Sequence, residues 1–110
     1  MSFKVSVSPN FGRELKRLAK KYPSIKADLS ELVNSLIESP FQGNSLGRDC
    51  YKVRMRISSK GKGKSGGSRV ITCVKIIKEQ IFLLSIYDKS EQSDISDVTL
   101  VQILTENGLL

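Results

Sequence analysis

Apolar side chains recur with two different periods in the N-terminal part of the chain, and each period predicts a different element. Residues 3–7 (FKVSV) alternate between apolar and polar, as expected for a strand with one buried face. Apolar residues then recur every three or four positions, which predicts two amphipathic helices. The first has Pro9 in its first turn and is ended by Pro23, and the second is capped by Ser24 and stopped at Pro40. The pattern therefore predicts a helical hairpin that packs on a sheet.

The next part of the chain changes to the alternating period of strands. Residues 41–49 contain two glycines and predict a loop. Residues 51–57 (YKVRMRI) alternate strictly, and residues 69–76 (RVITCVKI) predict the next strand. Residues 81–87 (IFLLSIY) are apolar on both faces, as expected for a strand in the centre of a sheet.

A last helix is predicted to begin near Ser93 or Ser96, because either serine can cap it. Val98, Val101 and Leu104 would then line its buried side. The order of elements becomes βααβββα, and no linker or internal repeat divides the chain. We therefore predict a single α+β domain over all 110 residues, with the helical hairpin packed on a mainly antiparallel sheet.

The composition excludes several kinds of chemistry. The chain contains no histidine, so Ser-His-Asp and Cys-His catalysis are both ruled out. Cys50 and Cys73 are too few for a disulfide framework, and no histidine is present to complete a zinc site, so we expect buried thiols and no cofactor. No apolar run is long enough to cross a bilayer and the N-terminus has no signal-peptide pattern, so we expect a cytoplasmic protein.

The net charge of +7 is concentrated in one part of the chain. From residue 48 to residue 69, eight basic residues stand against Asp49 alone. They are Arg48, Lys52, Arg54, Arg56, Lys60, Lys62, Lys64 and Arg69. From residue 70 onward, three basic residues stand against six acidic ones. A field concentrated in this way favours binding of a polyanion, with an ordinary solvated basic face as the alternative.

Part of this charge lies on one face of the strand predicted at residues 51–57. Because strand side chains have a period of two, Lys52, Arg54 and Arg56 point to one side and the apolar residues between them point to the other. Three neighbouring cations repel one another unless water screens them or an anion lies opposite. The strand therefore predicts a surface that binds phosphate groups.

The stretch SSKGKGKSGGSR, residues 58–69, carries lysines separated by glycines. Its Gly63-Lys64-Ser65 resembles the end of a Walker A loop, but such a loop needs glycine where this chain has Ser58, and a helix must follow it. Here two glycines and a β-branched strand follow, so nucleotide hydrolysis is excluded. We interpret the stretch as a flexible arm that follows a phosphate backbone, with a hairpin loop kept soluble by lysines as the alternative.

Two longer stretches, DCYKVRMRISSKGKGKSGGSRVI and FLLSIYDKSEQSDIS, occur in this order. Together they resemble the RelE/ParE superfamily of toxins from bacterial type II toxin–antitoxin systems. The Lys/Gly loop before GG-x-R-V-I and the later LL-x-I-Y-x-K pattern are most similar to the HigB-like branch. The resemblance covers residues 39–97, and the preceding strand and helices fit the RelE-like fold that it implies.

The resemblance implies a toxin that cleaves mRNA in the ribosomal A site without a metal ion and so inhibits translation. The 2′-hydroxyl would attack the adjacent phosphate and leave a 2′,3′-cyclic phosphate. By their positions in the motifs, the implied catalytic residues are Lys52, Arg54, Arg69, Tyr87 and Lys89. The implied RNA-binding residues are Arg48, Arg56, Lys60, Lys62 and Lys64. The implied partner is a cognate antitoxin that binds DNA.

One departure from the family pattern leaves the acid and base of this reaction open. The best-known ribosome-dependent members carry a tyrosine near the start of the last helix, where this chain has Ile95 and Ser96. Two other functions share the fold: a DNA gyrase inhibitor of the ParE kind, and a degenerate member that binds RNA without cleaving it. The clustered Lys52, Arg54 and Arg69 favour the nuclease, because they form a phosphate site.

Overall fold

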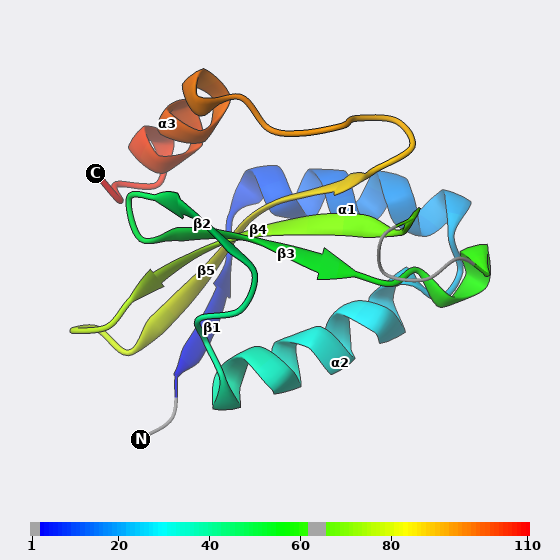
Figure 1. Cartoon of the computed structure of the whole chain (residues 1–110), viewed down its shortest axis with the longest axis horizontal. Coiled ribbons are helices and arrows are strands. Elements are labelled where there is room, and N and C mark those ends of the chain that lie inside the picture. The colour runs from blue at the N-terminus through cyan, green and yellow to red at the C-terminus, as the bar shows by residue number, and fades with distance from the viewer. Residues whose placement is uncertain (1–2, 62–65) are drawn as a thin grey trace.

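A five-stranded sheet separates two layers of helix, with α1 and α2 packed on one face and α3 on the other (Figure 1). The computed structural model describes residues 3–61 and 66–110. The helices are α1 (Pro9–Lys21), α2 (Ile25–Glu38) and α3 (Asp97–Glu106). The strands are β1 (Lys4–Val7), β2 (Asn44–Gly47), β3 (Cys50–Met55), β4 (Ser68–Lys75) and β5 (Gln80–Asp88), and a short 3-10 helix follows β3 at Ser58–Lys60.

The strand order in the sheet is β1-β5-β4-β3-β2. Only the pair of β1 and β5 is parallel among the pairs of described strands, and the other three pairs are antiparallel. The predicted α+β class and mainly antiparallel sheet are therefore confirmed. β5 lies between β1 and β4, which explains why its sequence is apolar on both faces.

The predicted helical hairpin is also confirmed, and its caps follow from single residues. The Ser8 hydroxyl accepts a hydrogen bond from the Phe11 backbone N–H at the start of α1. Ser24 occupies the cap position of α2, but its hydroxyl donates to the Asp28 carboxylate instead of accepting from the helix backbone. In the described part of the chain, none of the helices has the length and apolar character that a membrane crossing requires.

The predicted loop at residues 41–49 contains a strand that the sequence analysis missed. β2 pairs with β3 in antiparallel register, and Arg48 and Asp49 form the turn between them with positive φ angles of 54° and 64°. Two such residues in sequence are typical of the tight turn that joins hairpin strands. The order of elements is therefore βααββββα, and the prediction of βααβββα was one strand short.

The buried side of α3 also differs from the prediction. Val98 is 79% exposed, whereas Leu100, Ile103 and Leu104 are buried. The Ser96 hydroxyl accepts from the Thr99 backbone N–H, so the helix begins at Asp97. Ser96 is thus the cap, which was one of the two predicted positions. Leu104 lies on the buried side of the helix, as predicted.

Two hydrophobic clusters, one on each face of the sheet, hold these layers together. The cluster under α1 and α2 is centred on Phe11, Leu18, Ile25 and Leu36 and on the apolar side chains of the sheet that face them. The cluster under α3 joins Cys50, Ile71, Cys73, Leu84 and Tyr87 to Leu100, Ile103, Leu104 and Leu109. Cys50 and Cys73 are free, buried and paired in register, which agrees with the predicted buried thiols.

Gly43, just before β2, is expected to tolerate no side chain. Its φ is +90°, and a Cβ there would lie 2.2 Å from the backbone oxygen of Lys52. We expect Gly43→Ala to lower the free energy of unfolding by about 2–3 kcal/mol in urea titrations. Gly12 in α1 is the matched control, because no atom lies within 4 Å of its Cβ position, and Gly12→Ala should raise stability by roughly 0.5–1 kcal/mol. Equal effects of the two substitutions would contradict the close approach of residues 43 and 52.

Candidate nucleic-acid interface

Three neighbouring strands place Arg54, Arg69 and Tyr87 in one row. Arg54 of β3 pairs in register with Arg69 of β4, which pairs in register with Tyr87 of β5. Side chains of directly paired residues lie on the same face of a sheet. Lys52 lies on this face too, because it is two residues before Arg54 in the same strand. The register therefore brings together four of the five residues predicted to be catalytic.

The four residues differ in how far they reach the surface. Arg54 is exposed, and the Lys52 side chain is 22% exposed. Arg69 is only 3% exposed and Tyr87 only 2% exposed. A phosphate group arriving from solvent would therefore meet Lys52 and Arg54 first, whereas Arg69 and Tyr87 lie below the surface.

Tyr87 keeps its proton in this environment. Burial raises the pKa of its hydroxyl, the negative charge of Asp94 raises it further, and the positive charge of Arg69 opposes the two. Within residues 3–61 and 66–110, the hydroxyl has no hydrogen-bond partner. A neutral, buried hydroxyl beside Arg69 can donate a hydrogen bond to an anion that enters the site.

The segment between β5 and α3, residues 89–96, brings negative charge to this face. The Asp94 Oδ1 lies 3.1 Å from the Lys52 Nζ, and the Ile95 backbone N–H donates to the same oxygen at 2.8 Å. The hydrogen bond from Ile95 and the Lys52 ammonium lower the pKa of Asp94, and the charge of Lys89 acts in the same direction. The sequence analysis missed Asp94, although it lies in the stretch DKSEQSDIS that carries the family resemblance.

Lys89, the fifth predicted catalytic residue, is exposed at the start of the same segment. Its backbone N–H donates to the Gly67 carbonyl oxygen at 3.0 Å, so the segment leaves the sheet beside the end of the lysine–glycine stretch. The charge of Lys89 also acts on Asp94, so Lys89 belongs to the same face as the other four residues.

Lys60 occupies a different environment from the one predicted. Its Nζ lies 2.7 Å from the Asp88 Oδ1 and 5.5 Å from the centre of the Tyr22 ring, and its side chain is 13% exposed. It donates to the Ser90 hydroxyl as well. The prediction treated Lys60 as a flexible arm for RNA, whereas the structure holds it in a largely buried ion pair. The carboxylate that receives it comes from a distant part of the chain, which no local pattern reveals.

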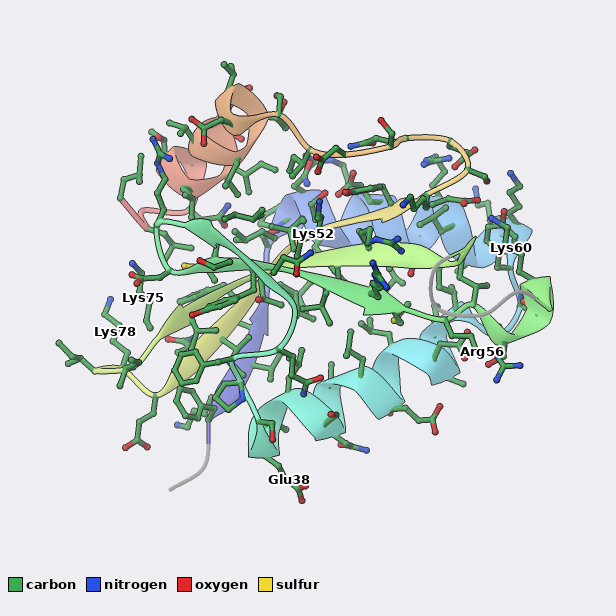
Figure 2. All side chains as sticks on the ribbon, viewed as in Figure 1. Glu38, Lys52, Arg56, Lys60, Lys75 and Lys78 are labelled. Carbon is green, nitrogen blue, oxygen red and sulfur yellow. The ribbon has the colours of Figure 1, made fainter. Side chains whose placement is uncertain are left out.

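The other predicted RNA-binding residues are spread around the site. Arg56 is exposed just after β3, and Arg48 forms an exposed ion pair with Asp97 at 3.0 Å. Lys62 and Lys64 lie outside the residues that the structure describes. Figure 2 shows Lys52 near the middle of the sheet and Arg56 and Lys60 toward the end with the 3-10 helix, whereas Lys75 and Lys78 lie at the opposite end.

The arrangement suits anion binding rather than metal binding. Among the described residues, no group of three or more His, Cys, Asp or Glu side chains comes together in a way that could hold a metal ion. The row instead offers guanidinium and ammonium groups, which bind phosphate oxygens through charge-assisted hydrogen bonds.

Comparison with known proteins agrees with this fold. Residues 11–106 match the family described as the RelE toxin of the RelE/RelB toxin–antitoxin system. The match spans most of the chain, and the protein therefore belongs to the RelE toxin family.

Solved structures of RelE proteins share the fold. A doubly substituted mutant of the E. coli toxin RelE in the free state has a TM-score of 0.60 at 23% identity, over 84% of this chain and 90% of that one. The intact E. coli RelBE toxin–antitoxin complex has a TM-score of 0.60 at 22% identity, over 80% and 96%. Isolated E. coli RelE has a TM-score of 0.59 at 21% identity, over 94% and 96%.

Proposed function

We propose that this RelE-family toxin is a metal-independent endoribonuclease of the HigB-like branch that cleaves mRNA on the ribosome and so inhibits translation. The observation that carries the proposal is the row of Arg54, Arg69 and Tyr87 with Lys52 beside it. In RNA cleavage by the 2′-hydroxyl, negative charge builds up on the phosphate oxygens at the transition state. Cations and hydrogen-bond donors placed around those oxygens lower the barrier.

The two exposed residues and the two buried residues of this group would have different roles. Lys52 and Arg54 are accessible, so they would bind the RNA backbone as it arrives and hold the scissile phosphate. The planar guanidinium of Arg69 can bind two phosphate oxygens at once. The neutral Tyr87 hydroxyl can donate a hydrogen bond to a further oxygen of the substrate.

A protein antitoxin is the proposed partner. One of the three similar E. coli structures is that of the intact RelBE toxin–antitoxin complex. A protein with a net charge of +7 offers an acidic partner a large favourable field. We expect the antitoxin to keep the toxin inactive when the two are produced together.

The proposal is tested by expressing the wild type and a Lys52→Ala/Arg54→Ala variant in a bacterial host and mapping mRNA 5′ ends within minutes. We expect new mRNA 5′ ends in translated reading frames with the wild type, and at least about 100-fold fewer with the variant. Each lost phosphate contact removes stabilisation of the transition state and so slows cleavage. A Lys75→Ala/Lys78→Ala variant is the matched control, because it removes two cations at the opposite end of the sheet (Figure 2).

Three outcomes separate this function from the alternatives. Growth arrest by the wild type with intact transcripts would point to a protein target such as DNA gyrase. RNA binding without arrest or cleavage would point to a degenerate member. Equal cleavage by the site variant and the control variant would remove Lys52 and Arg54 from the site.

A further inference from the structure

The proposed reaction needs a group that accepts a proton from the 2′-hydroxyl, and the chain has no histidine to do so. A general base must be unprotonated at the working pH and must lie within hydrogen-bond reach of the proton it accepts. Both conditions can be applied to each side chain that faces the row of Arg54, Arg69 and Tyr87.

The residues of the row do not meet the first condition. Lysine and arginine side chains carry their proton at neutral pH, so Lys52, Arg54 and Arg69 serve as cations. Tyr87 is neutral because burial raises the pKa of its hydroxyl. These four groups can stabilise charge or donate hydrogen bonds, but another group has to accept the proton.

Asp94 meets the first condition, because its pKa is lowered, and its position suits the second. Its Oδ1 lies 3.1 Å from the Lys52 Nζ, and its charge is felt by Tyr87 on the far side of β4. The carboxylate therefore lies over the same face as the row, between β3 and β5. Both of its contacts use Oδ1, and within the described part of the chain Oδ2 makes no hydrogen bond. Asp94 is 61% exposed, so Oδ2 is open to a substrate.

Six other carboxylates of the chain have contacts elsewhere. Asp49 pairs with Lys75, Asp97 with Arg48, and Glu91 with Arg17 and Lys21. Asp28 accepts from Ser58, Asp88 is buried against Lys60, and Glu14 accepts from Ser85. In the described part of the chain, none of these six forms an ion pair with one of the five predicted catalytic residues, whereas Asp94 pairs with Lys52.

We propose that Asp94 is the general base of the RNA cleavage, an inference that rests on the proposed function. The Asp94 Oδ2 takes the proton of the 2′-hydroxyl while the O2′–P bond forms and the P–O5′ bond breaks. The leaving 5′ oxygen takes a proton from water, and the Asp94 carboxyl then returns its own proton to the hydroxide that remains. Lys52 holds the carboxylate through Oδ1 and at the same time adds positive charge beside the phosphate.

This assignment predicts an unusual dependence of rate on pH. The groups that face Asp94 are Lys52 from β3, Tyr87 from β5 and Lys89 from the segment that follows β5. The Ile95 N–H and the two lysines keep the pKa of Asp94 below the ordinary value. Asp94 is therefore ionised throughout the range from about pH 5 to about pH 9, and the single-turnover rate should be nearly flat there. A lysine base would instead make the rate rise about tenfold per pH unit, because its unprotonated fraction rises by that factor.

The test measures single-turnover cleavage of mRNA on programmed ribosomes by the purified proteins. We expect Asp94→Asn to lower the rate at neutral pH by about 10²–10⁴-fold and to make the rate rise tenfold per pH unit, because hydroxide must then take the proton. Asp94→Glu should recover part of the rate and the flat profile. RNA-bound ribosomes should bind Asp94→Asn as tightly as the wild type, or more tightly, because a negative charge has been removed.

Asp49→Asn is the matched control. Asp49 has the same 61% exposure as Asp94 and pairs with Lys75 at 2.9 Å, and asparagine is tolerated at its positive φ. It should cleave at the wild-type rate. The inference is overturned if Asp94→Asn cleaves within a few-fold of the wild type, or if the wild-type rate rises tenfold per pH unit. A wild type that cleaves no mRNA would overturn the proposed function itself, and the inference with it.

Discussion

An Asp88→Asn variant is expected to lose about 3 kcal/mol of its free energy of unfolding at neutral pH. The Asp88 side chain is fully buried at the end of β5, and its carboxylate accepts hydrogen bonds from the Lys60 ammonium and from the hydroxyl and backbone N–H of Ser90. Tyr22 donates its hydroxyl to the other carboxylate oxygen. The variant would leave the largely buried ammonium of Lys60 without its counter-ion, which costs more than the hydrogen bonds alone.

The same cluster predicts how stability depends on pH. Burial on its own raises the pKa of Asp88, but the Lys60 ammonium and the hydrogen bonds from Tyr22 and Ser90 outweigh burial and bring the pKa well below the ordinary value. A carboxyl whose pKa is lowered by folding stabilises the folded state above the pKa of the unfolded chain, about 4. That contribution is lost as the pH falls from about 4 through the pKa of the folded state.

Lys60 adds a dependence at alkaline pH. The hydrogen bond from its ammonium to Asp88 raises the pKa of Lys60. Its contribution to stability is therefore complete below the pKa of lysine in the unfolded chain, about 10.4, and is lost as the pH rises through the higher pKa of the folded state. The difference in stability between wild type and Asp88→Asn should thus be largest between about pH 5 and about pH 9 and shrink on both sides.

Urea titrations of the two proteins at a series of pH values measure this difference, in which the other carboxylates cancel. Asp97→Asn is the matched control, because it removes one charge from the exposed pair with Arg48 and should change stability by less than about 0.5 kcal/mol. A cost below about 1 kcal/mol for Asp88→Asn, or a cost that does not vary with pH, would show that this cluster does not hold β5 to the 3-10 helix.

Arg69→Ala and Arg69→Lys are expected to lose about 100-fold or more of the proposed RNA cleavage. Arg69 is the central residue of the row, paired in register with Arg54 on one side and Tyr87 on the other. Lysine keeps the charge but lacks the planar guanidinium that binds two phosphate oxygens. Both substitutions should therefore reduce the stabilisation of the transition state. Growth arrest on induction should be relieved by both.

Because Arg69 is buried, folding has to be measured beside activity. Thermal unfolding of each purified variant separates a lost contact in the reaction from a lost fold. Arg13→Ala, which removes an exposed arginine from α1, should leave both arrest and stability unchanged. Full toxicity of a folded Arg69→Ala protein would remove this residue from the site.

The sequence by itself determined those features that depend on near neighbours in the chain. The pattern of apolar residues predicted both helices of the hairpin and four of the five strands, since each pattern reflects how one element is buried. The alternation of Lys52, Arg54 and Arg56 predicted a cationic face in the same way. The short, polar β2 escaped notice because its four residues hold only one large apolar side chain, and its pairing with β3 is what makes it a strand.

The tertiary structure alone decided which distant residues meet. The row of Arg54, Arg69 and Tyr87 depends on the register of three strands, which no single strand encodes. Lys52 and Asp94 are 42 residues apart in the chain, and Lys60 and Asp88 are 28 apart. The sequence predicted a catalytic role for Lys52 and an RNA-binding role for Lys60. Packing instead places the ion pair of Lys52 on the face of the proposed site and largely buries that of Lys60. The physical reason is that an ion pair depends on distance in space and on access to solvent, and both follow from how the layers pack.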